Sequence, residues 1–343
     1  MYQQYWLYTH KPSFADGFRG MSHGAEEARM IKRLVIVNGE SGKSAANDEI
    51  IEQMGQEEST QILRLTRDVD LNAMVHKAVV GDKCSTIVAA GGDGTVNVVV
   101  NAIMRLPLEL RPRLAIIPLG TANDFAGTLF IPDDIQEAVA TINDGVFVPI
   151  DVVRISAGNF ERFFANVAAG GNSVQVSESL TDDVKATWGA LCYIRGAVGV
   201  LGDMKTFEVK VDMDGESLEL DSWGVLVANG RTNAGRISVA PLASPSDGLL
   251  DVVIVKDGNV LDMIQIATKT LLSSLLECDQ VVFRQVKKLK LHSTPGMRFT
   301  LDGEVIDEEP IDFEIVPGAI KMMVGAEFHD QYASHDSSSA GRN

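Results

Sequence analysis

The sequence predicts two domains: an N-terminal α/β domain built on a parallel sheet, and a C-terminal β-rich domain whose strands run mostly antiparallel. The chain has 343 residues, which is enough for two domains of roughly 150 residues each. Its first half alternates apolar strand patterns with amphipathic helix patterns, whereas its second half contains short alternating runs separated by turn residues. We therefore expect the domains at 31–150 and 151–326.

Two flanking segments show neither pattern. Residues 1–30 lack the apolar stretch and cleavage site of a secretory signal. The C-terminal segment is polar and ends in SHDSSSAGRN, a composition typical of disorder. We expect a disordered extension at 1–30 and a polar tail at 327–343.

The predicted α/β domain contains four strands that are apolar along nearly their whole length. Such strands are typical of a parallel sheet that helices cover on both faces, and ligands of such sheets bind outside the carboxyl ends of the strands. The expected strands are 33–38, 61–66, 86–92 and 113–120, and the expected helices are 69–80, 95–104 and 135–143.

The predicted β-rich domain follows residue 151. The Asp214–Gly215 pair interrupts an alternating run and is a strong signal for a tight hairpin. Two helical insertions are expected within this domain, at 179–202 and 259–277.

Charge and cysteine content exclude several classes of function. The chain carries 30 Lys and Arg against 47 Asp and Glu, a formal net charge of −17, so it lacks the basic surface that nucleic-acid binding requires. Its cysteines, Cys84, Cys192 and Cys278, are scattered without metal-ligand spacing, which favours a reducing, cytoplasmic environment. No run of eighteen apolar residues is present, so we expect no membrane span.

The loop after the first strand contains Gly-Lys-Ser and resembles a phosphate-binding P-loop. That motif needs a glycine at position 37, where this chain has Val37. A plain strand-to-helix loop is therefore the better interpretation, although its backbone amides could still meet an anion.

The first glycine loop, residues 91–95, reads Gly-Gly-Asp-Gly-Thr between a strand and a helix. Glycines let the backbone approach a polyanion closely, and the helix N-terminus attracts negative charge. A dinucleotide fingerprint would need a third glycine where Asn97 stands. The alternative to a phosphate site is a tight turn without a ligand.

The second glycine loop, residues 118–125, follows the next strand. Thr121 and Asn123 are suitable caps for the helix that follows, and capping alone would explain them. However, the two loops lie at consecutive strand ends, and neither contains a lysine. Phosphate charge would therefore be met by backbone amides and a divalent cation.

Four motifs together resemble a known family. GGDGT at 91–95, PLGTANDFA at 118–126, SDGLLD at 246–251 and LDGE at 301–304 occur in the order and spacing of the diacylglycerol kinase catalytic-domain family. Within it, the chain is similar to the soluble bacterial lipid kinases of the YegS and diacylglycerol kinase B type. The resemblance covers residues 32–325 and implies an ATP- and Mg²⁺-dependent lipid kinase with a nucleotide-binding first domain and a lipid-substrate second domain.

The resemblance also implies site residues. The proton acceptor would be Glu304, with Asp302 as a helper, and a structural Mg²⁺ would be held by Ser244, Asp247 and Leu249. The implied ATP-binding residues are Asn38, Ser41, Thr66, Gly91, Gly92, Asp93, Gly94, Thr95, Asn97, Thr121, Asn123 and Asp124.

Two positions complicate this assignment. Glu216 lies in a second Asp-Gly-Glu turn, and composition does not distinguish it from Glu304; only the family order does. Val98 stands where the family usually has a glutamate, which removes a carboxylate from the nucleotide side. Two alternatives to a lipid kinase follow: a soluble-substrate kinase of the NAD kinase type, or a nucleotide or lipid sensor without turnover.

The expected partners are a lipid substrate, with diacylglycerol first among the lipids considered, and a membrane surface that the protein contacts transiently. The apolar stretch 186–202 would be a lid over an acyl chain or simply a packed helix. Basic residues at 284–292 would touch anionic headgroups or belong to a charged edge strand. The family includes dimers, so a homodimer is also expected.

Overall fold

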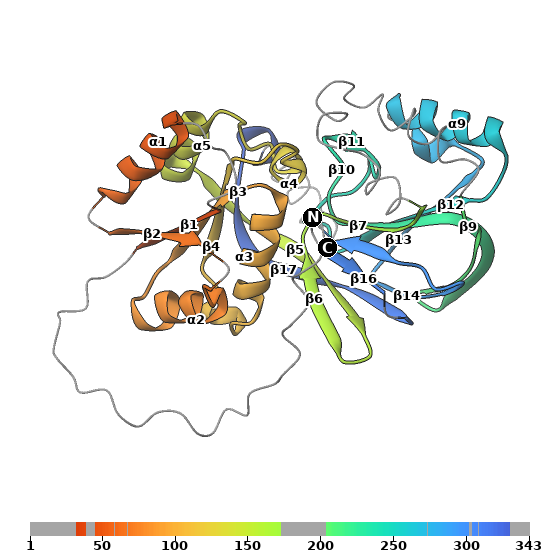
Figure 1. The fold of residues 1–343 in the computed structure, drawn as a ribbon, viewed down its shortest axis with the longest axis horizontal. Coiled ribbons are helices and arrows are strands. Elements are labelled where there is room, and N and C mark those ends of the chain that lie inside the picture. The colour runs from red at the N-terminus through yellow and green to blue at the C-terminus, as the bar shows by residue number, and fades with distance from the viewer. Residues whose placement is uncertain are drawn as a thin grey trace, which may run out of the picture.

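A computed structural model describes residues 32–38, 45–57, 59–66, 68–172, 204–272, 274–301, 304–307 and 309–329. Ser41, Asp302, Cys192 and the predicted helical insertion at 179–202 lie outside these residues, as does the predicted extension 1–30. Within them, the predicted fold class is confirmed: a parallel-stranded α/β domain precedes a β-rich domain (Figure 1).

The N-terminal domain has a parallel sheet in the order β4-β3-β1-β2. Three of its strands, β1, β3 and β4, are buried along almost their full length, as their continuous apolar sequences predict, whereas β2 at the edge has no fully buried residue. The strands are β1 (Arg33–Asn38), β2 (Thr60–Leu65), β3 (Thr86–Gly91) and β4 (Arg113–Pro118). The helices are α1 (Ala45–Gly55), α2 (Leu71–His76, extended by a wider turn at Lys77–Gly81), α3 (Asp93–Met104), α4 (Asp124–Thr128) and α5 (Ile135–Asp144), and Leu108–Leu110 forms a 3₁₀ turn.

The C-terminal domain is antiparallel and has a hydrophobic core of its own. The predicted hairpin at Asp214–Gly215 joins β8 to β9, and both turn residues have positive φ, at 53° and 92°. The shorter strands are β6 (Phe160–Phe164), β7 (Val167–Gly171), β8 (Phe207–Met213), β9 (Glu216–Ala228), β10 (Thr232–Asn233), β11 (Ile237–Ser238), β12 (Leu250–Lys256), β13 (Val281–Val286), β14 (Lys288–Thr294), β15 (Phe299–Leu301) and β16 (Glu304–Ile306). The predicted helix at 259–277 is α9 (Val260–Leu271), followed by a 3₁₀ turn at Leu275–Glu277.

Two long strands connect the domains. β5 (Val146–Ala157) runs without interruption through the predicted boundary at residue 150, and it pairs with β17 (Ile311–Val324) along most of its length. β17 also pairs with β14 and, through Met322, with Leu114 of β4. The sheet of one domain therefore continues into the sheet of the other. Phe328, which falls in the predicted polar tail, is 4% exposed and packs in the N-terminal core.

The prediction of a charged edge strand at 284–292 holds for Arg284, which lies on β13, because β13 pairs with β12 alone among the described strands. The rest of the stretch is not at an edge, because β14 pairs with β8 on one side and with β17 on the other. Its charged side chains alternate outward from a central strand. Acidic residues of other strands pair with three of the basic side chains: Arg284 with Glu216, Lys288 with Glu314, and Lys290 with Asp312. Much of this stretch's positive charge is thus balanced locally.

Two further observations concern the described residues. None of their helices is both long and apolar enough to cross a membrane. Cys84 and Cys278 are buried free thiols, and burial raises the pKa of Cys84.

Candidate active site

The parallel register brings the ends of several strands to one edge of the N-terminal sheet. Asn38 ends β1 opposite Leu65, and the exposed Thr66 follows β2 directly. Gly91 ends β3 opposite Pro118 of β4, so the two glycine loops leave the sheet side by side. Asn38, Thr66 and Gly91, three of the predicted nucleotide contacts, therefore share the carboxyl edge of the sheet.

The two glycine loops touch each other. A Cβ atom added to Gly120 would lie 2.4 Å from the Cα atom of Gly92, so neither position has room for a side chain. Gly92 precedes α3, and no side chain of the described residues caps that helix. The hydroxyl oxygen of Thr95 is buried without a hydrogen-bond partner in the described part of the chain. The closely packed backbone and the free amides at the N-terminus of α3 are features that suit a bound phosphate group.

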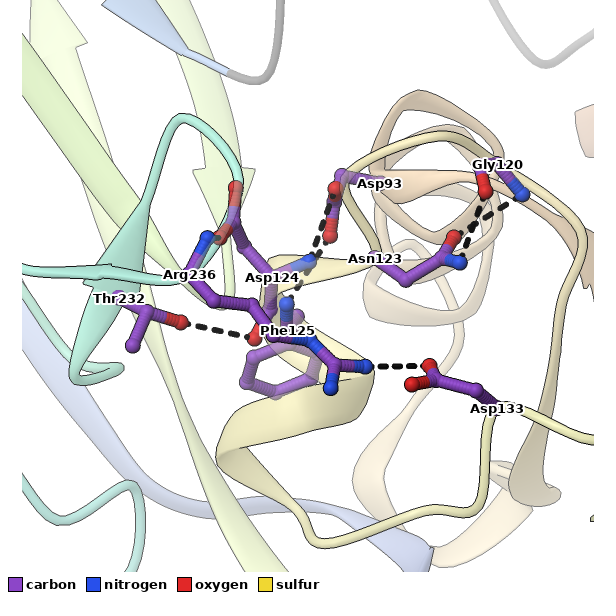
Figure 2. A network of polar contacts seen from close by, with 8 residues as sticks. All are labelled: Asp93, Gly120, Asn123, Asp124, Phe125, Asp133, Thr232 and Arg236. Atoms are coloured by element: carbon purple, nitrogen blue, oxygen red, sulfur yellow. Dashed lines mark hydrogen bonds and ion pairs between the residues drawn. The ribbon is translucent and has the colours of Figure 1, made fainter. Parts of the chain in front are cut away.

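Asp93 joins the two loops. Its carboxylate accepts hydrogen bonds from the backbone amides of Asp124, at 3.1 Å, and Phe125, at 3.0 Å (Figure 2). It therefore caps α4 from the neighbouring loop. Asn123 stands at the N-cap position, as the capping interpretation expects, but its side chain makes no capping hydrogen bond. Asn123 instead has φ 49° and closes its own loop, accepting from the Gly120 amide at 2.9 Å and donating to the Gly120 carbonyl at 2.8 Å.

Asp124 links the N-terminal domain to the β10–β11 hairpin of the C-terminal domain. Its side chain is buried and accepts hydrogen bonds from the backbone amides of Gly235 and Arg236. The hydroxyl of Thr232 donates to the Asp124 carbonyl (Figure 2). Burial raises the pKa of Asp124, with a smaller contribution from the nearby Asp93, although the amide hydrogen bonds act in the opposite direction. Asp124 thus holds the two domains together at the site.

A pocket of about 510 Å³ lies beside the second glycine loop, a size typical of small-molecule sites. Both domains contribute to its wall, and Thr121 is an exposed residue of its lining. The lining residues are Asn47, Pro118, Leu119, Gly120, Thr121, Ala122, Asn123, Asp133, Gly235 and Arg236.

Asn97 belongs to a contact between the domains. Its side-chain oxygen accepts a hydrogen bond from Asn101 at 2.6 Å, and Asn101 also bonds both backbone groups of Phe163 in β6. Asn97 is 9% exposed, whereas Val98 on the same helix is 40% exposed. The side-chain oxygen of Asn97 is therefore used in the hydrogen-bonded contact between α3 and β6, whereas Val98 lies on a solvent-exposed face of α3.

The predicted Mg²⁺ ligands share one turn. The Asp247 amide donates to the Ser244 carbonyl at 3.3 Å, and the Leu249 amide donates to the Asp247 carboxylate at 2.9 Å. The turn offers only oxygen atoms, which suits a hard cation. No cluster of three or more His, Cys, Asp or Glu residues that could hold a metal occurs in the described ranges. A cation here would therefore rely on main-chain oxygens and one carboxylate.

Sequence reasoning missed two buried carboxyl groups around this turn. Asp151 accepts hydrogen bonds at 2.7 Å from the amides of Gly248 and Gly318, and so fixes the turn against β17. Asp251 lies on β12 beside Gln285; burial raises its pKa to about 7, with a further increase from Asp247. The sequence signal for Asp151 is an acidic residue within an apolar strand, and the signal for Asp251 is its place at the end of the SDGLLD motif.

The two Asp-Gly-Glu turns occupy different places. Glu304 begins β16, which pairs with β15, and β15 pairs with β7 at the inner part of the C-terminal sheet. Glu216 begins β9 at the tip of the β8–β9 hairpin, where its exposed side chain pairs with Arg284 at 3.5 Å. Glu216 therefore fits a solvated hairpin position. The side chain of Glu304 lies outside the described part of the structure.

Comparison with known proteins places these features in a family. The chain matches the diacylglycerol kinase catalytic domain over residues 32–155, and the YegS C-terminal NAD kinase beta sandwich-like domain over residues 165–324. It is 31% identical over 282 residues to a diacylglycerol kinase of Bacillus subtilis, covering 80% of this chain and 90% of the relative. A diacylglycerol kinase of Staphylococcus aureus is 30% identical over 287 residues, with coverage of 81% and 88%.

A solved structure agrees with the sequence relatives. The crystal structure of a proposed diacylglycerol kinase from Bacillus anthracis superposes with a TM-score of 0.73 at 26% identity, covering 90% of this chain and 100% of that one. Because it covers 90% of this chain, the match extends through both domains. The chain therefore belongs to the diacylglycerol kinase family and is a lipid kinase.

Proposed function

We propose that this lipid kinase transfers the γ-phosphoryl group of ATP to the free hydroxyl of diacylglycerol with the help of Mg²⁺. The observation that carries the proposal is the contact between the two glycine loops at the carboxyl edge of the sheet, which suits a nucleotide's phosphates. The names of the relatives support diacylglycerol as the acceptor. The pocket beside the second glycine loop has room for part of a nucleotide.

The chain's own residues would act mainly by placement. Glycine-loop amides would bind phosphate oxygens, and Thr121 would contact the nucleotide from the pocket wall. Glu304 would accept the proton of the lipid hydroxyl, a role worth typically about 10²–10⁴ in rate. Mg²⁺, when bound with ATP, would neutralise phosphate charge. Ser244, Asp247 and Leu249 would hold a separate cation. Its role would be structural, because Asp151 fixes the turn that contains them against β17.

The experiment is transfer of labelled phosphate from ATP–Mg²⁺ to lipids in mixed micelles, with diacylglycerol, phosphatidylglycerol and a sphingoid base as acceptors. Wild type should label diacylglycerol. Glu304→Gln should lose about 10²-fold or more, because the variant cannot accept the proton. The matched control, Glu216→Gln, changes the other Asp-Gly-Glu turn and should leave the rate near that of wild type. Full activity in Glu304→Gln would refute the assigned base.

One observation favours a second candidate. The C-terminal family model is described as similar to an NAD kinase domain, so the same assay includes NAD as a soluble acceptor. Phosphorylation of NAD without micelles would replace the lipid proposal. Nucleotide binding with no labelled product would support a sensor, for which Val98, on the open face of α3, is the motivating residue.

We further propose that the protein works in the cytoplasm and contacts membranes transiently through α9. Three apolar side chains are exposed along this helix or directly after it: Leu261 at 74%, Ile264 at 47% and Leu272 at 70%. Figure 1 shows α9 at the outer end of the C-terminal domain, away from the N-terminal domain. An exposed apolar helix face of this kind suits the interfacial region of a bilayer.

A further inference from the structure

Arg236 is the one cationic residue among the described residues that line the pocket, and Asp133 is the one anionic residue. The rest of the lining is uncharged and comes mostly from the second glycine loop. Neither glycine loop contains a lysine or an arginine. A nucleoside triphosphate carries several negative charges, and a cationic side chain at this pocket could pair with them through charge-assisted hydrogen bonds.

The backbone conformation of Arg236 is unusual. Ala234, Gly235 and Arg236 have φ values of 57°, 90° and 66°, a left-handed stretch that favours glycine over residues with a Cβ. The amides of Gly235 and Arg236 donate to the buried carboxylate of Asp124, which holds the stretch in place. Backbone strain of this kind is concentrated at ligand-binding sites. Position 236 therefore carries an arginine where glycine would be the less strained residue.

The side chain of Arg236 follows a defined course to the pocket. It lies across α4 at Gly127, where an added Cβ would be 3.2 Å from the guanidinium Nε. It ends in an ion pair with Asp133 (Figure 2). The two side chains are 45% and 60% exposed, and ion pairs this exposed contribute little stability and exchange readily. A phosphate group would be a stronger partner, because an arginine can bind it through two charge-assisted hydrogen bonds.

We propose that Arg236 binds the polyphosphate of the nucleotide: its guanidinium leaves Asp133 and pairs with phosphate oxygens when a nucleoside triphosphate enters the pocket. The proposal rests on the proposed function, because it takes ATP as the ligand. Asp133 then competes with the phosphates for the same guanidinium. Its carboxylate also repels them, since it lines the same pocket.

The test measures nucleotide binding to the full chain in the absence of lipid, by displacement of a fluorescent ATP analogue with ATP or AMP. Arg236→Gly removes the side chain and keeps both the left-handed backbone and the amide that donates to Asp124. We expect the Kd for ATP to rise about 10- to 100-fold, the effect of one charge-assisted hydrogen-bonding group. The Kd for AMP should change much less. Thermal melting should show a variant at least as stable as wild type.

Asp133→Asn separates phosphate binding from a structural role of the ion pair. If Arg236 binds phosphate, this variant should bind ATP more tightly than wild type, because it frees the guanidinium and removes a repelling charge. If the pair is only a link between domains, Asp133→Asn and Arg236→Gly should weaken ATP binding alike. Arg284→Gln is the matched control: Arg284 is also 45% exposed and paired with a glutamate, but it lies on β13, which does not line the pocket. Its affinity for ATP should equal that of wild type.

Each remaining outcome decides the question. Unchanged ATP binding in Arg236→Gly, an equal loss for ATP and AMP, or weaker ATP binding in Asp133→Asn would overturn the assignment of Arg236. Absence of ATP binding in wild type would overturn both this assignment and the proposed function. Arg236-dependent ATP binding in a protein that labels no lipid would leave the assignment of Arg236 standing and reject the proposed lipid acceptor.

Discussion

Asp93 and Asp124 show how two carboxylates can organise a site through hydrogen bonds to the backbone. Asp93 ties the first glycine loop to the start of α4, and Asp124 ties the same turn to the β10–β11 hairpin. The carboxylate oxygens of both residues accept hydrogen bonds from backbone amides, and burying those amides without a partner would cost free energy. The position of the pocket wall therefore depends on these two side chains.

The raised pKa of Asp124 makes stability depend on pH. An unfolded aspartate loses its proton near pH 3.9, whereas burial keeps the folded carboxyl protonated to a higher pH. Within that window folding takes up a proton, so the free energy of unfolding should fall as the pH rises from about 4 toward the raised pKa, by at most about 1.4 kcal/mol per pH unit. Above the raised pKa this contribution no longer changes with pH.

Urea denaturation between pH 4 and pH 7 checks this prediction. Asp124→Asn does not titrate, so its free energy of unfolding should depend less steeply on pH than that of wild type, whatever its absolute stability. Equal slopes in the two proteins would show that Asp124 ionises at its ordinary pKa in the folded state.

At this scale the sequence predicts residue types better than residue roles. It indicates that residues 91–95 and 118–125 form loops at neighbouring strand ends, because glycines and apolar strands are local signals. It offers Thr121 and Asn123 as caps of α4, because capping is usually local. Asn123 does stand at the N-cap position, but the carboxylate that accepts from the helix amides is Asp93, 31 residues before Asp124. Arg236 and Asp133 are separated by 103 residues, so no local pattern could pair them.

At the scale of elements, α3 carries contacts to both domains. Asn101 bonds the amide and the carbonyl of Phe163 at 3.0 Å and 2.8 Å, and it also holds Asn97. Asn101→Ala would leave backbone groups of β6 without these partners. We expect the free energy of unfolding to fall by about 1–3 kcal/mol, as measured in urea.

Asn143→Ala is the control for this measurement. Asn143 accepts a hydrogen bond from Arg33 at an exposed position, where surface substitutions usually change stability by less than about 0.5 kcal/mol. Equal effects of the two substitutions would mean that α3 and β6 do not depend on the Asn101 contacts.

The exposed face of α9 gives a prediction about membranes. Leu261→Asp combined with Leu272→Gln should lower activity on diacylglycerol in vesicles several-fold, because less apolar surface enters the interface. Activity on a short-chain, water-soluble diacylglycerol should stay near that of wild type. Leu108→Gln, a 65% exposed leucine in the N-terminal domain, should leave both activities unchanged. A loss on the soluble substrate as well would show that α9 supports the site rather than the membrane.

At the scale of the whole molecule, the sequence indicates two domains, but it does not reveal how they are joined. The change from helix-forming to alternating patterns near residue 150 is real, yet β5 continues across it. β17 comes from the far end of the chain and pairs with β5 and with β4. Pairing between strands so far apart in the sequence cannot be predicted locally, because the residue pattern of a strand does not depend on which strand it pairs with. The domain boundary in the sequence is thus a continuous sheet in the structure.

Shared strands should make the two domains unfold together. Removing β17 or β5 from one sheet would expose apolar residues of both hydrophobic cores, because Val152 and Ile320 lie in one core and Val153 and Ile315 in the other. We expect a single cooperative transition in urea.

Two probes can follow this transition, one in each domain. Trp223, 8% exposed, reports on the C-terminal domain and Cys84, 4% exposed, reports on the N-terminal domain. A variant with Trp6 and Trp188 replaced by Phe, and Cys192 and Cys278 replaced by Ser, isolates both probes. Tryptophan fluorescence and thiol labelling should then give the same midpoint, whereas labelling of Cys84 at a lower urea concentration would show that the N-terminal domain unfolds by itself.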